Sequence, residues 1–168
     1  KFLDTVINEL SFPLVVKKVY GSLGEGIYLA HDKKELRDIY TKTFRNPLLF
    51  QKYVETSKGK SLRALVVNHK LLGIIQRNND GDFRSNYGNS TYSKMVDNDA
   101  VYRDFVEDII NKLDIEYAGI DLLFGDDNKP VLCEINSNAF FEEFEKTTKI
   151  NVAKKIGEMI LEKIGNEQ

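Results

Sequence analysis

The feature that most constrains the fold is a pair of apolar runs that carry polar residues. Residues 119–123 and 132–136 favour strands, and glycine, aspartate, asparagine and proline fill the segment between them. This pattern predicts a β-hairpin. Because side chains alternate in direction along a strand, Glu134 and Asn136 are expected on one face, where Asp121 can join them from the neighbouring strand.

These three polar groups have a chemical interpretation. A carboxylate in an apolar strand is costly to bury unless it is paired or binds a cation. Two carboxylates and an amide offer the oxygen ligands that Mg²⁺ prefers, and Mg²⁺ commonly binds together with phosphate groups. A solvent-facing strand is the alternative for any one of these residues. The three together favour a metal and phosphate site at Asp121, Glu134 and Asn136.

Composition limits the class of protein. The 168 residues are 42% hydrophobic and 30% charged, as in a soluble globular chain of one moderate domain or two small lobes. A net charge of −2 gives no reason to expect nucleic-acid or membrane binding. No apolar run approaches the roughly 20 residues of a membrane span. Cys133 is the single cysteine, so an intrachain disulfide is excluded; a core position and a reducing, cytoplasmic location are expected.

The expected elements alternate between helices and short hairpins. Besides the central hairpin, strands are predicted over residues 14–19, 27–30, 48–54, 62–67 and 71–76. Helices are predicted over residues 1–10, after a cap at Asp32, from a cap at Asp97 or Asn98 to residue 113, and from Asn151 to residue 164, the last buried along Val152, Ile156, Met159 and Ile160. Residues 78–93 and 137–149 have no period and are expected to be irregular. The pattern favours an α+β fold on antiparallel sheets over a dinucleotide-binding fold.

A glycine-rich loop lies between the first two predicted strands. Gly21, Gly24 and Gly26 would let backbone amides approach phosphate oxygens, although a flexible hairpin turn is an equal alternative. The loop joins two strands, whereas a P-loop opens a helix. Strand alternation puts Lys17 on the side of such a ligand and Lys18 on the other side.

Several arginines fall near the predicted metal site in the sequence. Arg63 alternates with apolar residues, so it is expected to be partly buried and to need an anion. Arg77 and Arg84 flank the irregular tract and Asn86 follows, with a surface position as the alternative for each arginine. Residues 50–54 lead out of a strand and are either a hinge that reads adenine through its backbone or an ordinary strand end.

Together these segments resemble the ATP-grasp fold, in the branch of the ribosomal-protein α-L-glutamate ligase and related amino-acid ligases. The resemblance is carried by residues 12–17, the three glycines of the loop, and residues 83–86, 118–123, 134–137 and 142–153. It implies two lobes of antiparallel sheet with packed helices. Residues 1–54 would form the small lobe with the glycine loop, and residues 55–168 the C-terminal lobe with the Mg-ATP site.

The resemblance also implies an activity, that of an ATP-dependent carboxylate–amine ligase. In that family a carboxylate attacks the γ-phosphate of ATP, and an amine then captures the acyl phosphate. The implied partners are ATP, an amino acid with glutamate favoured, and a carboxylate acceptor that is a small molecule or a protein C-terminus. The resemblance leaves the oligomeric state open, and a homo-oligomer is compatible with it.

The family's site residues carry over to three groups of positions. The residues that would bind ATP are Lys17, Gly21, Gly24, Gly26, Gln51, Lys52, Tyr53, Val54 and Ser61. Two Mg²⁺ ions, or Mn²⁺ in their place, would be held by Asp121, Glu134 and Asn136. The residues that would face the acyl phosphate or its acceptor, and so form the catalytic group, are Arg63, Arg77, Arg84 and Asn86.

Four positions depart from the family pattern. Lys52 stands where glutamate is usual, and Ser61 stands where aspartate is common. An Arg-Gly-Gly sequence is replaced at residues 89–91, and a Pro-Gly sequence is replaced by Ala139 and Phe140. The last two departures concern the substrate side and leave the amino acid and the acceptor open.

Two other functions remain possible from the sequence, namely a nucleotide-binding module without ligase activity and an ATP-dependent small-molecule kinase on the same fold. The chain starts without methionine, and the family has a further N-terminal domain with another phosphate-binding lysine. The resemblance therefore implies that this domain is missing and that residues 1–168 fold but are inactive alone. The glycine loop and residues 78–93 are expected to be the least ordered parts.

Overall fold

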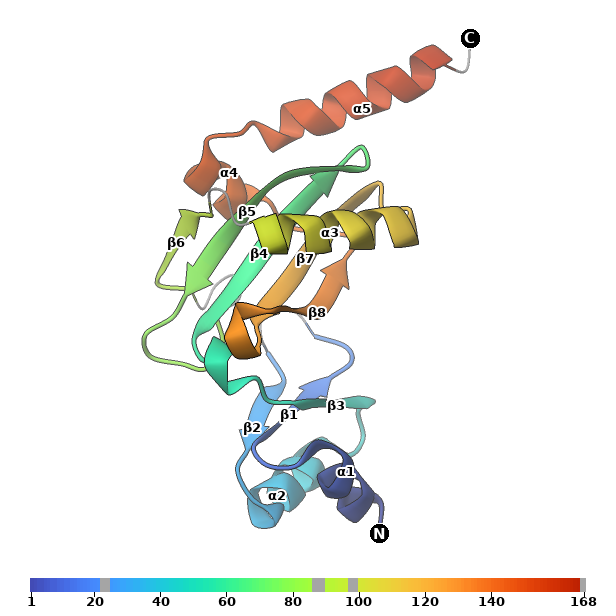
Figure 1. Ribbon diagram of the computed structural model, residues 1–168. Coiled ribbons are helices and arrows are strands. Elements are labelled where there is room, and N and C mark those ends of the chain that lie inside the picture. Colours follow the sequence, from blue (N-terminus) through green and yellow to red (C-terminus); the bar gives the residue numbers. More distant parts are fainter. Residues whose placement is uncertain (22–24, 86–89, 97–99, 167–168) are drawn as a thin grey trace. The chain divides into compact units, whose positions relative to one another are not determined.

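The computed structural model describes residues 1–21, 25–85, 90–96 and 100–166 (Figure 1). The chain divides into two compact units, Lys1–Glu55 and Thr56–Gln168. Each unit has its own antiparallel sheet with packed helices, which confirms the predicted α+β class. Within the described ranges, no helix combines the length and apolar character that a bilayer crossing needs.

The first unit is a small sheet covered on one face by two helices. Its elements are α1 (Phe2–Leu10), β1 (Leu14–Lys18), β2 (Ile27–Ala30), α2 (Lys33–Thr43) and β3 (Leu48–Lys52), with the strands in the order β2-β1-β3. Leu14 and Val16 are fully buried against the helices, so alternation puts Lys17 on the opposite face. The predicted cap is confirmed, because the Asp32 side chain accepts a hydrogen bond from the Glu35 N–H at 2.8 Å.

The second unit is built on a five-stranded sheet. Its strands are β4 (Lys60–Val67), β5 (Lys70–Asn78), β6 (Tyr92–Met95), β7 (Tyr117–Phe124) and β8 (Pro130–Asn136), in the order β6-β5-β4-β7-β8. Its helices are η1 (Glu55–Ser57), which starts at the unit boundary, α3 (Ala100–Leu113), η2 (Asp126–Asn128), α4 (Glu142–Thr148) and α5 (Val152–Asn166). The predicted central hairpin is confirmed as the antiparallel pair β7 and β8.

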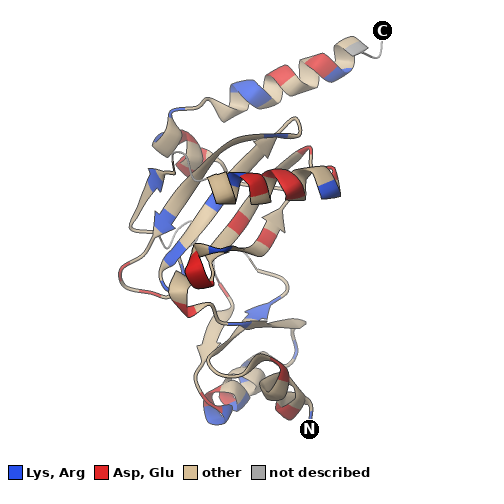
Figure 2. Cartoon of the chain, viewed as in Figure 1, with Lys and Arg blue, Asp and Glu red and all other residues tan. Residues whose placement is uncertain are grey.

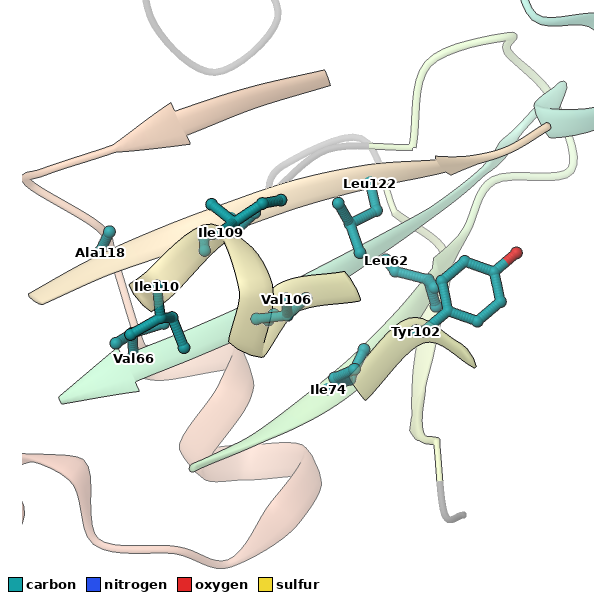
Figure 3. Packing of buried hydrophobic residues seen from close by; sticks show 11 residues of the cluster. Leu62, Val66, Ile74, Tyr102, Val106, Ile109, Ile110, Ala118 and Leu122 are labelled. Atoms are coloured by element: carbon teal, nitrogen blue, oxygen red, sulfur yellow. The ribbon is translucent and has the colours of Figure 1, made fainter. Parts of the chain in front are cut away.

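The five-stranded sheet lies between helices on its two faces. Even-numbered residues of β4 such as Leu62 and Val66 pack against Val106 and other apolar residues of α3 (Figure 3). On the other face, Leu65 belongs to a cluster with Phe144 of α4, Val152 of α5 and their neighbours. Odd-numbered residues of β4 therefore lie on the α4 side of the sheet, and this face also carries the charged residues described below.

Several expectations about individual segments are wrong. Residues 142–148 form α4, although the acidic segment around them shows no helical period because a short helix buries few side chains. Residues 92–95 form β6, an edge strand whose backbone pairs with β5 although its side chains are largely exposed. Ile160 is 48% exposed, so the buried stripe of α5 is narrower than predicted. Cys133 is only partly buried, and the other residues of β8, which is an edge strand of the sheet, are partly buried or exposed.

Candidate active site

Charged residues interrupt the strands of the five-stranded sheet, where apolar side chains would be usual (Figure 2). Arg63 on β4 is the cross-strand partner of Asp121 on β7. The Nε and Nη2 atoms of Arg63 donate to Oδ1 and Oδ2 of Asp121, both at 2.7 Å. The two residues are each 7% exposed. The prediction that Arg63 is buried and paired with an anion is confirmed.

Gly119 provides the space that the Arg63 guanidinium occupies. A Cβ atom at position 119 would overlap Nη1 of Arg63 and would lie 2.8 Å from Cβ of Ala139. Position 119 is opposite Leu65, two residues along β4 from Arg63. A side chain at position 119 would therefore displace the guanidinium from Asp121.

Arg77 on β5 extends this pair across the sheet. Arg77 is 1% exposed, its Nε donates to Oε2 of Glu143 at 2.7 Å, and its Nη1 donates to Oδ1 of Asp121 at 3.4 Å. Oε1 of Glu143 accepts a hydrogen bond from the Ser90 hydroxyl at 2.9 Å. Arg63, Asp121, Arg77 and Glu143 thus alternate in charge, and we refer to them as the buried charge cluster. Glu143 was not foreseen, because it lies in the segment predicted to be irregular.

The cluster shifts the pKa values of its own members. Burial raises the pKa of Asp121, while Arg63 and Arg77 oppose that rise. Burial also lowers the pKa of Arg77, against the attraction of Asp121 and Glu143. The short bidentate bonds to Arg63 are those of an ionised carboxylate. Asp121 is therefore a buried anion whose charge depends on its arginine neighbours.

Glu134 and Asn136 on β8 meet Asp121, as strand alternation predicts. Glu134 is the cross-strand partner of Asp121 and is exposed to solvent. The Nδ2 atom of Asn136 donates to Oε1 of Glu134 at 2.8 Å and to Oδ2 of Asp121 at 3.4 Å. One amide nitrogen contacts both carboxylates, so the three polar ends converge on one place.

The chemistry of this donor set fits a hard divalent cation. In the described ranges no cluster of three or more His, Cys, Asp or Glu side chains could hold a metal, so the amide of Asn136 would have to complete the set. Rotating that amide by half a turn would present its oxygen in place of its nitrogen, without any change of shape. Arg63 uses one acceptor position on each oxygen of Asp121, and the second position of each oxygen is met by a longer contact of 3.4 Å, from Arg77 at Oδ1 and from Asn136 at Oδ2. Water and phosphate oxygens commonly supply the remaining Mg²⁺ ligands.

Two other predicted residues of this unit lie in a neighbouring loop and strand. Arg84 binds Asp82 through its Nη2 at 2.6 Å, so the structure places its charge on a local partner in the loop. Ser61 is buried and its hydroxyl accepts a hydrogen bond from Ser85 at 2.8 Å. Asn86 lies outside the described residues.

The predicted nucleotide residues of the first unit lie on its sheet and loops. Lys17 is the penultimate residue of β1 and lies on the face opposite Leu14 and Val16. Gln51 and Lys52 end β3, and Tyr53 and Val54 follow directly. Gly26 has a φ of +76°, and a Cβ there would lie 2.9 Å from Cδ of Lys18. Such a positive φ is one that glycine adopts without strain. Gly21 precedes the gap in the described residues, and Gly24 lies within it.

Comparison with known proteins places this chain in a family. Residues 1–160 match the model of the RimK-like ATP-grasp domain. Human beta-citrylglutamate synthase B is 35% identical over 146 residues, which are 86% of this chain and 38% of that protein. The probable alpha-L-glutamate ligase of Enterobacter sp. (strain 638) is 33% identical over 148 residues, 86% of this chain and 49% of that protein.

A solved structure supports the same fold. The ATP-grasp ligase PsnB, complexed with a minimal precursor, Mg and ADP, superimposes with a TM-score of 0.65 at 19% identity, over 86% of this chain and 44% of that one. The chain spans about half the length, or less, of the curated relatives it matches. The extent of the family match and the identity with the human relative establish that the chain belongs to the RimK-like ATP-grasp family.

Proposed function

We propose that this chain carries the metal and nucleotide site of an ATP-dependent ligase that joins an amino acid to a carboxylate through an acyl phosphate. The observation that carries the proposal is the convergence of Asp121, Glu134 and Asn136 beside two buried arginines in a RimK-like ATP-grasp domain. Carboxylate and amide oxygens next to fixed positive charge suit a site that handles Mg²⁺ and phosphate together.

Each residue group has a distinct task in this proposal. Asp121, Glu134 and Asn136 would hold one or two Mg²⁺ ions, or Mn²⁺, and Arg63 would fix the orientation of the Asp121 carboxylate. Such a cation, when bound, neutralises phosphate charge in the transition state. Arg77 lies in the same cluster, and Arg84 and Asn86 would meet the acyl phosphate or its acceptor.

Each unit by itself carries residues that we assign to nucleotide binding. Lys17 would supply a point charge for phosphates, and backbone amides at Gly21, Gly24 and Gly26 would approach the phosphate oxygens. Adenine would be read through backbone groups of residues 51–54. In the second unit, Ser61 would contact the ribose. Its hydroxyl accepts a hydrogen bond from the Ser85 hydroxyl.

Glutamate is the amino acid that the comparisons favour. Citrylglutamate and glutamate appear in the names of the two relatives described above, which are 35% and 33% identical to this chain. The acceptor carboxylate belongs either to a small molecule or to a protein C-terminus, and the replaced positions Ala139 and Phe140 lie three and four residues after Asn136. A reducing, cytoplasmic location remains part of the proposal.

The proposal is tested by ADP release from the natural protein that contains this sequence, assayed with Mg²⁺ and a panel of amino acids and carboxylates. We expect release that requires both substrates and falls at least about 100-fold in Asp121→Asn, because electrostatic stabilisation of a transition state is worth this much. Asp108→Asn is the control, since Asp108 pairs with Lys112 on the exposed side of α3. Nucleotide binding without any substrate-dependent ADP release would leave a binding module and contradict the proposal.

We also propose that residues 1–168 fold as an isolated chain but do not turn over. The two units contain their own apolar clusters, which supports folding. The chain covers 38% and 49% of two relatives, and phosphoryl transfer depends on positioning groups of the kind that the rest of such a protein can supply. Substrate-dependent ADP release by this chain at the rate of the natural protein would contradict this part of the proposal.

A further inference from the structure

Glu143 reaches the buried charge cluster from α4, whereas Arg63, Arg77 and Asp121 come from strands of the sheet. Its side chain is 12% exposed, and both of its carboxylate oxygens are engaged. Oε2 accepts from Arg77 at 2.7 Å and Oε1 accepts from Ser90 at 2.9 Å. The carboxylate is therefore held from two sides in one orientation.

Two carboxylates contact the guanidinium of Arg77 through different nitrogens, Glu143 at Nε and Asp121 at Nη1. The bond to Glu143 is 2.7 Å long, while the contact with Asp121 is 3.4 Å long. A hydrogen bond between ionised groups is usually about 2.8 Å long, so the second contact is a weak one. Glu143 thus takes the stronger bond and limits the approach of Arg77 to Asp121.

The distance between Arg77 and Asp121 matters for any cation at Asp121. Arg63 already uses one acceptor position on each oxygen of Asp121, and a short bond from Arg77 would use a third. A second guanidinium without its own carboxylate would also repel a divalent cation at this place, where water screens little. Both effects would weaken cation binding if Glu143 were absent.

We infer that Glu143 is a positioning residue that holds and neutralises Arg77 and thereby keeps Asp121 available to a divalent cation. The inference rests on the proposed function, because it takes Asp121 as a cation ligand. Glu143 itself acts through Arg77 and is not a ligand. The sequence alone does not predict this positioning role, because Glu143 is one of several glutamates in an acidic segment.

The test measures the dissociation constant of Mn²⁺ from the natural protein with ADP present, by the electron paramagnetic resonance of free Mn²⁺. Glu143→Gln should weaken Mn²⁺ binding about tenfold, as is common for residues that orient a metal ligand. Glu142→Gln is the matched control, because Glu142 is on the same turn of α4 and pairs with Lys146 at the surface. The control should bind Mn²⁺ like the unchanged protein.

Repeating the measurement in a protein that lacks the Arg77 guanidinium separates action through Arg77 from direct attraction between Glu143 and the cation. In Arg77→Gln protein there is no guanidinium to hold, so adding Glu143→Gln should change the dissociation constant by less than about twofold. An equal loss in both backgrounds would overturn the inference, as would unchanged binding in Glu143→Gln alone. Absence of Mn²⁺ binding in the unchanged protein would instead contradict the proposed function.

Glu143→Gln leaves the buried Arg77 without the neutralising charge of Glu143, so a milder variant is needed in case the protein does not fold. Ser90→Ala removes only the hydroxyl that holds Oε1 of Glu143. It should weaken Mn²⁺ binding about threefold, at the low end of the net contribution of one hydrogen bond, because the bond from Arg77 still holds the carboxylate. If Glu143→Gln does not fold and Ser90→Ala binds Mn²⁺ like the unchanged protein, the inference is wrong.

Discussion

Arg63 and Asp121 face each other across β4 and β7 and share two hydrogen bonds of 2.7 Å, both within a buried part of the sheet. Such a pair fixes the carboxylate more firmly than a single contact would, because the planar guanidinium matches both oxygens. The orientation of Asp121 toward Glu134 and Asn136 thus depends on a residue of the neighbouring strand.

Removing one member of this pair should cost much of the protein's stability. Arg63→Met should lower the free energy of unfolding by about 3–5 kcal/mol, because Asp121 is left as a buried charge with one weak arginine contact. Urea unfolding at pH 7 measures the change. Lys112→Met, which breaks an exposed pair on α3, should have a much smaller effect. A similar loss for both variants would contradict the special role of the buried pair.

Gly119 should tolerate no side chain. Gly119→Ala should lower the free energy of unfolding by about 1–3 kcal/mol, the usual cost of overpacking, because its Cβ overlaps Nη1 of Arg63. Gly157→Ala in α5 is the matched control. Nothing lies within 4 Å of a Cβ at position 157, so this change should stabilise the helix by up to about 1 kcal/mol. Thermal unfolding of the two variants should therefore shift in opposite directions.

Lys17 and Lys18 should differ in their effect on nucleotide binding. Lys17 lies on the helix-free face of β1, and the backbone N–H of Lys18 donates to the Gly26 carbonyl at 2.9 Å. Lys17→Ala should weaken ATP binding about tenfold, the value of one hydrogen bond to a charged group, and Lys18→Ala should change it little. Isothermal titration of the natural protein with ATP measures both. Equal losses would mean that the assigned face is wrong.

Glu145 should stabilise the start of α5. Its Oε1 accepts from the backbone N–H groups of Val152 at 2.6 Å and Ala153 at 3.2 Å, while Oδ1 of Asn151 accepts from the Lys154 N–H at 2.7 Å. Glu145→Ala should cost about 1 kcal/mol, the usual value of a helix cap. Hydrogen exchange should become faster in the first turn of α5 and remain unchanged in α3. Unchanged exchange in α5 would contradict this capping role.

Much of the fold could be predicted because the responsible signals are local. Alternation in β4 and β7, and the caps at Asp32 and Asn151, follow from neighbouring residues in the sequence. Segment α4 was missed because only Phe144 of its side chains is buried, which leaves no period to detect. The edge strand β6 was missed for a related reason, since backbone pairing with β5 forms it without a buried face.

The part of the candidate site that lies on one pair of strands could be predicted from the sequence. The part formed by segments far apart in the sequence could not. Asp121, Glu134 and Asn136 belong to one hairpin, so alternation alone brings them together. Glu143 joins Arg77 from a position 66 residues away in the chain, and no local pattern predicts such a contact. Arg84 pairs with Asp82 in its own loop, and its place facing the acyl phosphate or its acceptor stays a prediction.

The central claim, ligation through an acyl phosphate, is tested most directly by the fate of the acceptor's carboxylate oxygen. The natural protein is incubated with Mg-ATP, glutamate and an acceptor whose carboxylate carries ¹⁸O. The masses of the products are then measured by mass spectrometry. Attack of that carboxylate on the γ-phosphate, followed by amine capture, leaves one acceptor oxygen in the released phosphate and forms an amide. We therefore expect ¹⁸O in inorganic phosphate together with an amide product. Phosphate without ¹⁸O, or a stable phosphorylated product without a new amide, would contradict the claim.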